Sequence, residues 1–282
     1  KLNNFYWLFS LDLKSSKKSV QTIIKSWIEK NHKYNSKTWK FKLTSKRIIS
    51  LLSNTNLTYD NGEEQYQKDF NFIIHKQTLH LINQIEKEKC LNNRIIGAAA
   101  IILVGLSYKS ERNIKLKGLE HLKKIINYTF DNVGILKSRN IKSSIFFLKY
   151  LILIREWFKE SQSEIPEFVD EYIFNLGQSY AFFWSNLKFD PLFNGNNNSN
   201  NEEFDIYLKR HGYSFKNDNF EFSDYVSFKN KKINLIMDIG SSPGRKFSEK
   251  YQAGALSFEF ASNGKKIFTN SGYFEKNNSK FN

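Results

Sequence analysis

The chain of 282 residues is long enough for one large domain or two modest ones, with a sizeable buried core. Its 40% hydrophobic and 16% aromatic content excludes a disordered chain, its single cysteine excludes a disulfide framework, and no apolar run is long enough to cross a membrane. We therefore expect a soluble globular protein. The formal net charge of +15 is compatible with an acidic partner. It is also compatible with a solvated surface whose lysines reflect a genome rich in A and T, because the lysines are scattered along the chain.

The first part of the chain carries the periodicity of helices. Apolar residues recur every three to four positions, and Thr44 or Ser45 is a plausible N-cap for the second helix. Pro166 fits the first turn of the last one. About seven helices are predicted, over residues 20–28, 47–52, 63–88, 92–106, 116–130, 145–158 and 166–184.

After a polar break, GNNNSNNEE at 195–203, the period becomes two. Tyr225–Phe228 is expected to open an antiparallel sheet. Residues 233–239 and 256–261 alternate, and Asn263-Gly264 predicts a hairpin turn into 265–270. Helices followed by antiparallel strands predict a multidomain α+β protein rather than alternating βαβ units.

No motif in the sequence predicts a cofactor. The GSSPGR stretch at 240–245 lacks the spacing, the lysine and the following helix of a phosphate loop. His75 and His80 are five residues apart, so they do not share a helix face as a metal pair would. Cys90 is expected to be a small packing residue, and no GxSxG elbow is present.

The stretch 240–272 resembles the opening of the β-domain in the heparinase II/III-like family. In that family, an Asp-x-Gly strand end leads into a strand reading His-Ala-Gly-x-x-Ser-Phe-Glu, followed by a basic hairpin and Asn-x-Gly. The matching positions here are Asp238, Gly240, Ala253, Gly254, Ser257, Phe258, Glu259, Asn270 and Gly272.

Five helical segments look like parts of the family's toroid: WLFSLDL at 7–13, SWIEKN at 26–31, 92–106, GILKSRN at 134–140 and FFWSNLKFDPLFNG at 182–195. The resemblance implies an incomplete (α/α) toroid of antiparallel helix pairs over residues 1–195. It implies the first strands of a truncated antiparallel β-sandwich over 206–282. The chain begins with Lys1 and ends on a polar EKNNSKFN, so we expect both ends to be cut.

Characterised members of this family are polysaccharide lyases that cleave at C4 of a uronic acid by β-elimination. The resemblance implies an acidic polysaccharide as the substrate. Such a site must neutralise the uronate carboxylate, remove the C5 proton with a base and protonate the leaving oxygen. It needs no cofactor, although a structural divalent metal in the missing part of the β-domain stays open.

The resemblance also implies the site residues. Asn93, Arg139 and Gln252 stand at family catalytic positions, and Tyr251 is the phenol nominated beside them. Arg94, Asn194 and Arg245 are the expected substrate-binding residues. The sequence departs from the family pattern where histidine or Tyr-His is common, at Arg94, Leu136, Ser143, Ser144 and Gln252.

Three functions stay open from the sequence: a lyase, a non-catalytic binder or other processor of envelope glycans, and a generic binder of polyanions or nucleic acid. We favour the lyase, with an acidic polysaccharide as partner, no nucleic acid and no membrane span. The resemblance suggests the periplasm or cell envelope. The oligomeric state is unknown.

Overall fold

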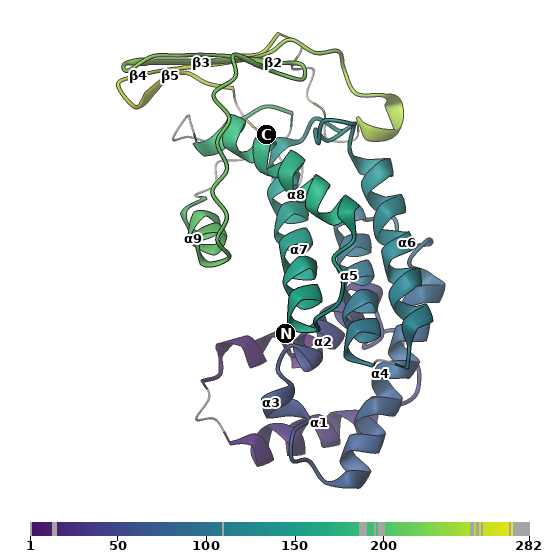
Figure 1. The fold of residues 1–282 in the computed structure, drawn as a ribbon. Coiled ribbons are helices and arrows are strands. Elements are labelled where there is room, and N and C mark those ends of the chain that lie inside the picture. The colour runs from purple at the N-terminus through teal and green to yellow at the C-terminus, as the bar shows by residue number, and fades with distance from the viewer. Residues whose placement is uncertain are drawn as a thin grey trace, which may run out of the picture. The chain divides into compact units, whose positions relative to one another are not determined.

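A computed structural model describes residues 2–12, 16–108, 110–185, 191–194, 196, 201–248, 251, 254, 256–270 and 272 (Figure 1). The chain divides into two compact units. The first comprises 1–126 and 153–165, and the second comprises 127–152 and 166–282. This division does not follow the change from helix to strand, because α-helices contribute to both units. The domain boundaries expected at 195 and 206 stay a prediction.

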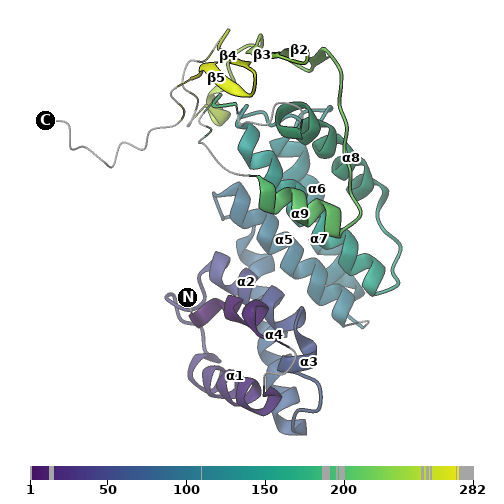
Figure 2. The same ribbon diagram turned by 90° about the vertical axis from the view of Figure 1, so that its left-hand side faces the viewer.

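The first unit is helical (Figure 2). It begins with two short 3-10 helices, Leu2–Asn4 and Tyr6–Ser10. It then contains α1 (Lys17–Asn31), α2 (Phe41–Leu52), α3 (Thr55–Thr58), α4 (Glu64–Gln84), α5 (Leu91–Ser107) and most of α6 (Arg112–Thr129). Each helix that the sequence predicts for this unit is present, and the short helix α3 was not predicted.

Helix α5 forms the centre of the first unit. Every residue from Ile95 to Leu106 is buried, as its run of small and aliphatic residues predicts. The helix packs against α2 and α4. Gly105 lies where a Cβ would collide with the backbone of Lys115, which brings α5 and α6 close together.

The predicted N-cap of α2 was wrong. The helix begins at Phe41, so Thr44 and Ser45 lie inside it and are fully buried. Ser45 Oγ donates a hydrogen bond to the carbonyl of Phe41 at 2.8 Å. Ser and Thr bond the preceding turn of a helix in this way when they are not at its start.

The second unit contains the N-terminal half of α7 (Ile141–Glu160), α8 (Glu167–Tyr180), a π-helical turn at Ala181–Ser185 and α9 (Glu202–Arg210). Pro166 directly precedes α8, one position before the expected site.

Helix α9 lies partly in the segment expected to be a polar break. Phe204 and Leu208 are its buried residues, and the Phe204 ring packs edge-on against Tyr180 at 5.1 Å. Acidic residues occupy its first turn and basic residues its last, which complements the helix dipole. Two apolar residues four positions apart were too weak a signal to predict this helix.

The sheet of the second unit is a five-stranded antiparallel meander, in the order β1-β2-β3-β4-β5. Its strands are β1 (Glu221–Phe222), β2 (Tyr225–Lys229), β3 (Ile233–Asp238), β4 (Phe258–Ser262) and β5 (Lys265–Phe268). Asn263 and Gly264 both have positive φ (48° and 75°), so the predicted hairpin turn is present. The strand expected to open the sheet is the second, because β1 precedes it.

The two faces of the sheet differ in burial. The face toward the π-helical turn carries Tyr225 and Ile236, both fully buried, and Phe183 packs edge-on against Tyr225 at 4.8 Å. The other face carries Phe228, Phe258 and Phe268, which are all at least 43% exposed among the described residues. Figure 1 shows the sheet nearly edge-on, with α8 beyond one face.

Within the part of the chain that the structure describes, no helix is long and apolar enough to cross a membrane.

Candidate functional site

The loop before α7 presents Arg139 toward the sheet. Asp131 organises this loop, because its carboxylate accepts hydrogen bonds from the amides of Val133 and Ile135 at 3.1 and 2.8 Å. Arg139 has a left-handed backbone (φ 56°) and directly precedes Asn140, whose side chain accepts from the amide of Ser143 in the first turn of α7. A non-glycine residue holds this conformation only where its surroundings fix it.

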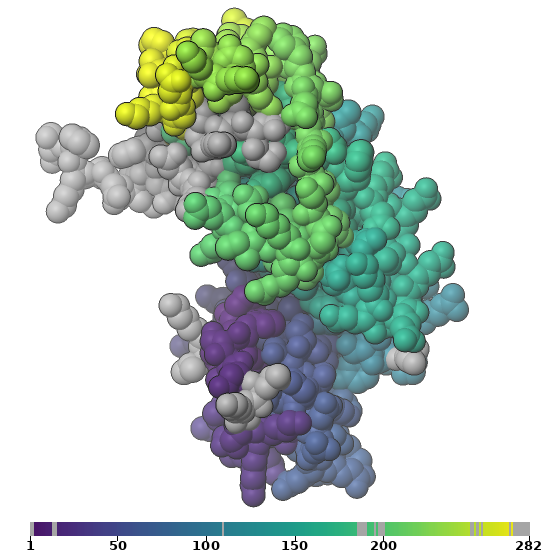
Figure 3. Space-filling view, turned by 60° about the vertical axis from the view of Figure 1, so that its left-hand side comes forward, coloured from purple at the N-terminus to yellow at the C-terminus, as the bar shows by residue number. Residues whose placement is uncertain are grey.

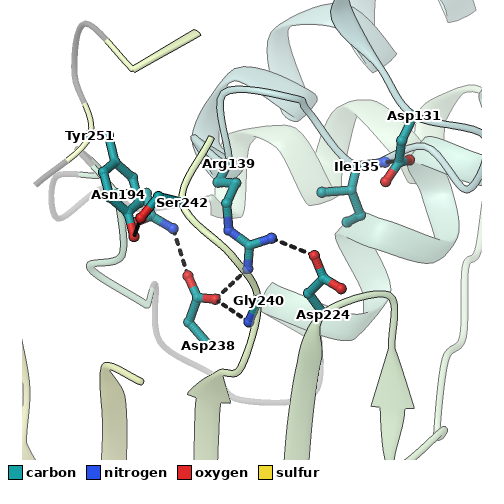
Figure 4. Close-up of polar contacts among 9 residues, drawn as sticks. All are labelled: Asp131, Ile135, Arg139, Asn194, Asp224, Asp238, Gly240, Ser242 and Tyr251. Atoms are coloured by element: carbon teal, nitrogen blue, oxygen red, sulfur yellow. Dashed lines mark hydrogen bonds and ion pairs between the residues drawn. The ribbon is translucent and has the colours of Figure 1, made fainter. Parts of the chain in front are cut away.

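Two carboxylates fix the guanidinium of Arg139 (Figure 4). Nη1 donates to Asp224 at 2.8 Å, from the turn between β1 and β2, and Nη2 donates to Asp238 at the end of β3. The side chain of Asp238 is 1% exposed, whereas that of Asp224 is 53% exposed. The Arg139–Asp238 pair is therefore buried, and the Arg139–Asp224 pair lies at the surface.

Asp238 joins three segments of the second unit. Its second carboxylate oxygen accepts from Nδ2 of Asn194 at 2.8 Å, and the oxygen that binds Arg139 also accepts from the amide of Gly240 at 3.1 Å. A Cβ at position 240 would collide with the Arg139 guanidinium, so this position requires glycine. We call Arg139, Asn194, Asp224, Asp238 and Gly240 the Asp238 cluster.

Tyr225 lies beneath the cluster. The Arg139 guanidinium lies over its ring, 4.6 Å from the centroid. Burial raises the pKa of Tyr225, the charge of Asp238 raises it further, and Arg139 and Asn194 oppose the increase. Its hydroxyl and Asn194 Oδ1 are both buried and lack a hydrogen bond of good geometry among the described residues. The phenol is thus neutral over the physiological range.

This arrangement has a chemical consequence for Arg139. Both terminal nitrogens already bind carboxylates, and only Nε is without a hydrogen-bond partner among the described residues. A guanidinium paired in this way has little capacity left for a carboxylate of a ligand. The geometry suits a role in positioning the loop, the sheet and the segment around Asn194.

A second group of expected residues lies in the loop between β3 and β4. Tyr251 is half-buried, and its hydroxyl accepts an exposed hydrogen bond from Ser242 Oγ at 3.2 Å. Arg245 begins a 3-10 turn (Arg245–Phe247) and is exposed. Gln252 lies outside the described residues.

The remaining two expected residues are in the first unit. Asn93 and Arg94 occupy the first turn of α5 and are half-buried. Burial lowers the pKa of His121, and the nearby charge of Arg94 acts in the same direction. In the second unit, Arg139 and Asn194 therefore both bind Asp238, and Tyr251 bonds to Ser242. Asn93 and Arg94 belong to the first unit.

The sequence analysis missed two members of the arrangement, Asp224 and Tyr225. Asp224 lies in a turn where Ser223 has positive φ (51°), and nothing in its local pattern distinguishes it from a solvated turn residue. The local pattern predicts Tyr225 only as a strand residue. Among the described residues, no group of three or more His, Cys, Asp or Glu side chains is placed to hold a metal ion.

Comparison with known proteins supplies the family context. Residues 215–282 match the family model "Heparinase II/III-like, C-terminal". No curated protein sequence matches the chain.

Solved structures extend the match to nearly the whole chain. A crystal structure of heparinase III matches with a TM-score of 0.70 at 16% identity, over 98% of this chain and 51% of that one. A heparan sulfate lyase mutant from Pedobacter heparinus matches with a TM-score of 0.76 at 14% identity, over 99% of this chain and 50% of that one. The chain thus spans about half the length of the structures it matches.

These matches confirm the resemblance to the heparinase II/III-like family and the fold class that the sequence predicts. Helices in the order of an (α/α) toroid are followed by an antiparallel sheet that occupies the place of the first strands of a β-sandwich. Residues 215–282 thus match the heparinase II/III-like C-terminal family model, and nearly the whole chain shares the fold of solved heparinase III structures.

Proposed function

We propose that this chain belongs to a lyase that cleaves an acidic, uronate-containing polysaccharide by β-elimination. The observation that carries the proposal is the family match of residues 215–282, which include the Asp238 motif and the loop around Tyr251. The heparinase III fold of the remaining chain supports it. The net charge of +15 is compatible with a polyanionic substrate.

The proposed reaction requires three groups. A base removes the proton at C5, the electron pair forms the C4–C5 double bond, and the C4–O bond breaks. An acid then protonates the departing oxygen. A group that neutralises the uronate carboxylate makes the C5 proton more acidic.

We assign these roles to the expected residues as follows. Tyr251 is the candidate base, because the half-buried residue presents an exposed hydroxyl that already accepts a hydrogen bond from Ser242. Asn93 and Gln252 are candidates to neutralise the uronate carboxylate, and Arg94, Asn194 and Arg245 are candidates to hold the sugar chain. Arg139 acts as a positioning residue through the Asp238 cluster.

The test is the ultraviolet absorbance of the unsaturated uronate product. The chain is incubated with heparan sulfate, chondroitin sulfate or alginate, and we expect absorbance to rise with one of them. Tyr251→Phe should lower the rate by roughly 100-fold or more, the contribution of a general base. Tyr34→Phe is the matched control, because Tyr34 is 65% exposed and lies in the first unit. Equal rates in both variants would remove Tyr251 from the mechanism.

A second candidate function is binding of an acidic glycan without cleavage. Two observations favour it. Arg139 is paired with two carboxylates, and Gln252 and Arg94 stand at positions where family members commonly carry histidine. Saturable binding that weakens with salt, without any absorbance change, would favour this alternative. Equal competition by unrelated DNA would instead indicate a generic polyanion binder.

A further inference from the structure

A pocket of about 540 Å³ opens in the first unit, between the N-terminal 3-10 helices and α1. This volume is within the usual range of small-molecule sites, roughly 300–1,000 Å³. Its lining includes Asn3, Phe5, Trp7, Trp27, Lys30 and Asn31. We call it the tryptophan pocket. Figure 3 shows that the N-terminal part of the chain, in purple, lies at the surface.

Aromatic rings form the walls of the tryptophan pocket. Phe5 is buried and packs edge-on against Trp27 at 5.6 Å and at a tilt against Trp7 at 5.9 Å. Both indoles are half-buried. Trp27 is fixed further, because its Nε1 donates to Asn3 Oδ1 at 3.0 Å. The pocket thus offers an apolar surface of aromatic rings that contact one another.

The charge at this pocket is positive. Lys30 is its one charged lining residue and makes no ion pair among the described residues. Behind Trp27 lies Arg47, which is 0% exposed and whose guanidinium is 4.1 Å from the centre of the indole.

Arg47 has no carboxylate partner within the described chain. Nε donates to the carbonyl of Asn3 at 2.7 Å, Nη2 donates to the carbonyl of Thr38 at 2.6 Å, and Nη1 has no hydrogen-bond partner. A buried cation is normally paired. Lys30 and Arg47, two cations near Trp27 with no carboxylate partner among the described residues, favour a bound anion.

We propose that the tryptophan pocket binds one anionic pyranose ring of an acidic polysaccharide, as a subsite separate from the Asp238 cluster and the Tyr251 loop. The C–H face of the ring would pack on the indoles, its carboxylate or sulfate would meet Lys30, and its hydroxyls would meet the side-chain amides of Asn3 and Asn31. This inference rests on the proposed function for its ligand class and adds a binding site to it.

The test is isothermal titration of the chain with a heparan sulfate hexasaccharide, with neutral maltohexaose as the matched probe. We expect binding of the acidic sugar alone. Trp7→Ala and Lys30→Met should each weaken it by roughly tenfold, in line with the loss of one aromatic or charged contact. Tyr34→Ala and Lys33→Met are the controls, because both residues are exposed and outside the pocket, and they should bind as the unchanged chain does.

Each contrary result has a distinct meaning. If the acidic sugar binds and all four variants bind it equally, the tryptophan pocket is not a subsite and the proposed function is untouched. If maltohexaose binds equally well, the anionic class is wrong. If dodecanoate binds in place of both sugars, the pocket is a site for an acyl chain. Failure of the unchanged chain to bind or cleave any acidic glycan would overturn the proposed function together with the subsite.

Discussion

Asp238 bonds to more partners than any other residue of the cluster that bears its name. Its carboxylate accepts from the side chains of Arg139 and Asn194 and from the amide of Gly240, and the side chain is 1% exposed. Asp224 binds the same guanidinium but is 53% exposed. The two carboxylates therefore provide a matched pair that differs mainly in burial.

We expect Asp238→Asn to lower the free energy of unfolding by about 3–5 kcal/mol, because it leaves the buried Arg139 charge without its main partner. Asp224→Asn should lower it by only about 0–1 kcal/mol, as for an exposed ion pair. Urea unfolding of both variants measures the difference. Equal losses would show that burial does not control the energetics of the cluster.

Tyr225 gives a pH-dependent prediction. Because burial raises its pKa, the folded chain keeps the phenol protonated at pH values where the unfolded chain releases the proton, above about 10. Its contribution to stability is complete below that pH and is lost as the pH rises further.

Tyr225→Phe should cost little at pH 7, about 0–1 kcal/mol, because the hydroxyl makes no hydrogen bond of good geometry. Above pH 10 the variant should lose less stability than the unchanged chain. Urea unfolding at both pH values checks this, with Tyr34→Phe as the exposed control. Parallel pH profiles for Tyr225→Phe and the unchanged chain would contradict the burial effect.

At the scale of elements, the contact between α5 and α6 depends on a residue without a side chain. A Cβ on Gly105 would meet backbone and Cβ atoms of Lys115, which cannot rotate away. The small residues of α5 thus set how closely its neighbours approach. At Gly97, by contrast, the nearest atoms belong to the ring of Phe41, which is a side chain.

Gly105→Ala should destabilise the chain by roughly 1–3 kcal/mol through overpacking, even though alanine is the better helix former by about 1 kcal/mol. Gly244→Ala is the control, since nothing lies within 4 Å of the position of its Cβ. The thermal midpoints of the two variants give the comparison. A stabilised Gly105→Ala would mean that α5 and α6 can separate without loss.

At the scale of the whole molecule, the chain carries an exposed apolar face on its sheet. Phe228, Phe258 and Phe268 lie on it at 49%, 43% and 59% exposure. The pairing Phe228–Leu235–Phe260–Phe268 forms one row across four strands. Contiguous exposed apolar surface of this kind normally marks an interface, and the chain spans about half of the heparinase structures that it matches.

We predict that the chain binds an apolar fluorescent dye through this face. Phe258→Ser combined with Phe268→Ser should lower the dye signal, because it removes two of the large exposed rings. Phe72→Ser is the matched control, since Phe72 is 60% exposed and lies on α4, outside the sheet. An unchanged signal in the double variant would place the dye elsewhere.

The sequence by itself predicted the helices from α1 to α8 except the short α3, the four longer strands and the Asn263-Gly264 turn. These features depend on local periodicity and on turn chemistry, which neighbouring residues alone determine. The resemblance in residues 240–272 also predicted the family from the residues themselves, and the C-terminal family match and fold agree with it.

Other features were decided only by the tertiary structure. The alternation of side chains along residues 233–239 predicted β3 but not which face of the strand is buried. Ile236 and Asp238 are buried, whereas Ile233 is 40% exposed. The pairing of Arg139 with Asp224 and Asp238, 85 and 99 residues away, and the tryptophan pocket also arise from contacts between distant segments. Local pattern cannot specify such contacts, because burial and charge pairing depend on what the rest of the chain places against each residue.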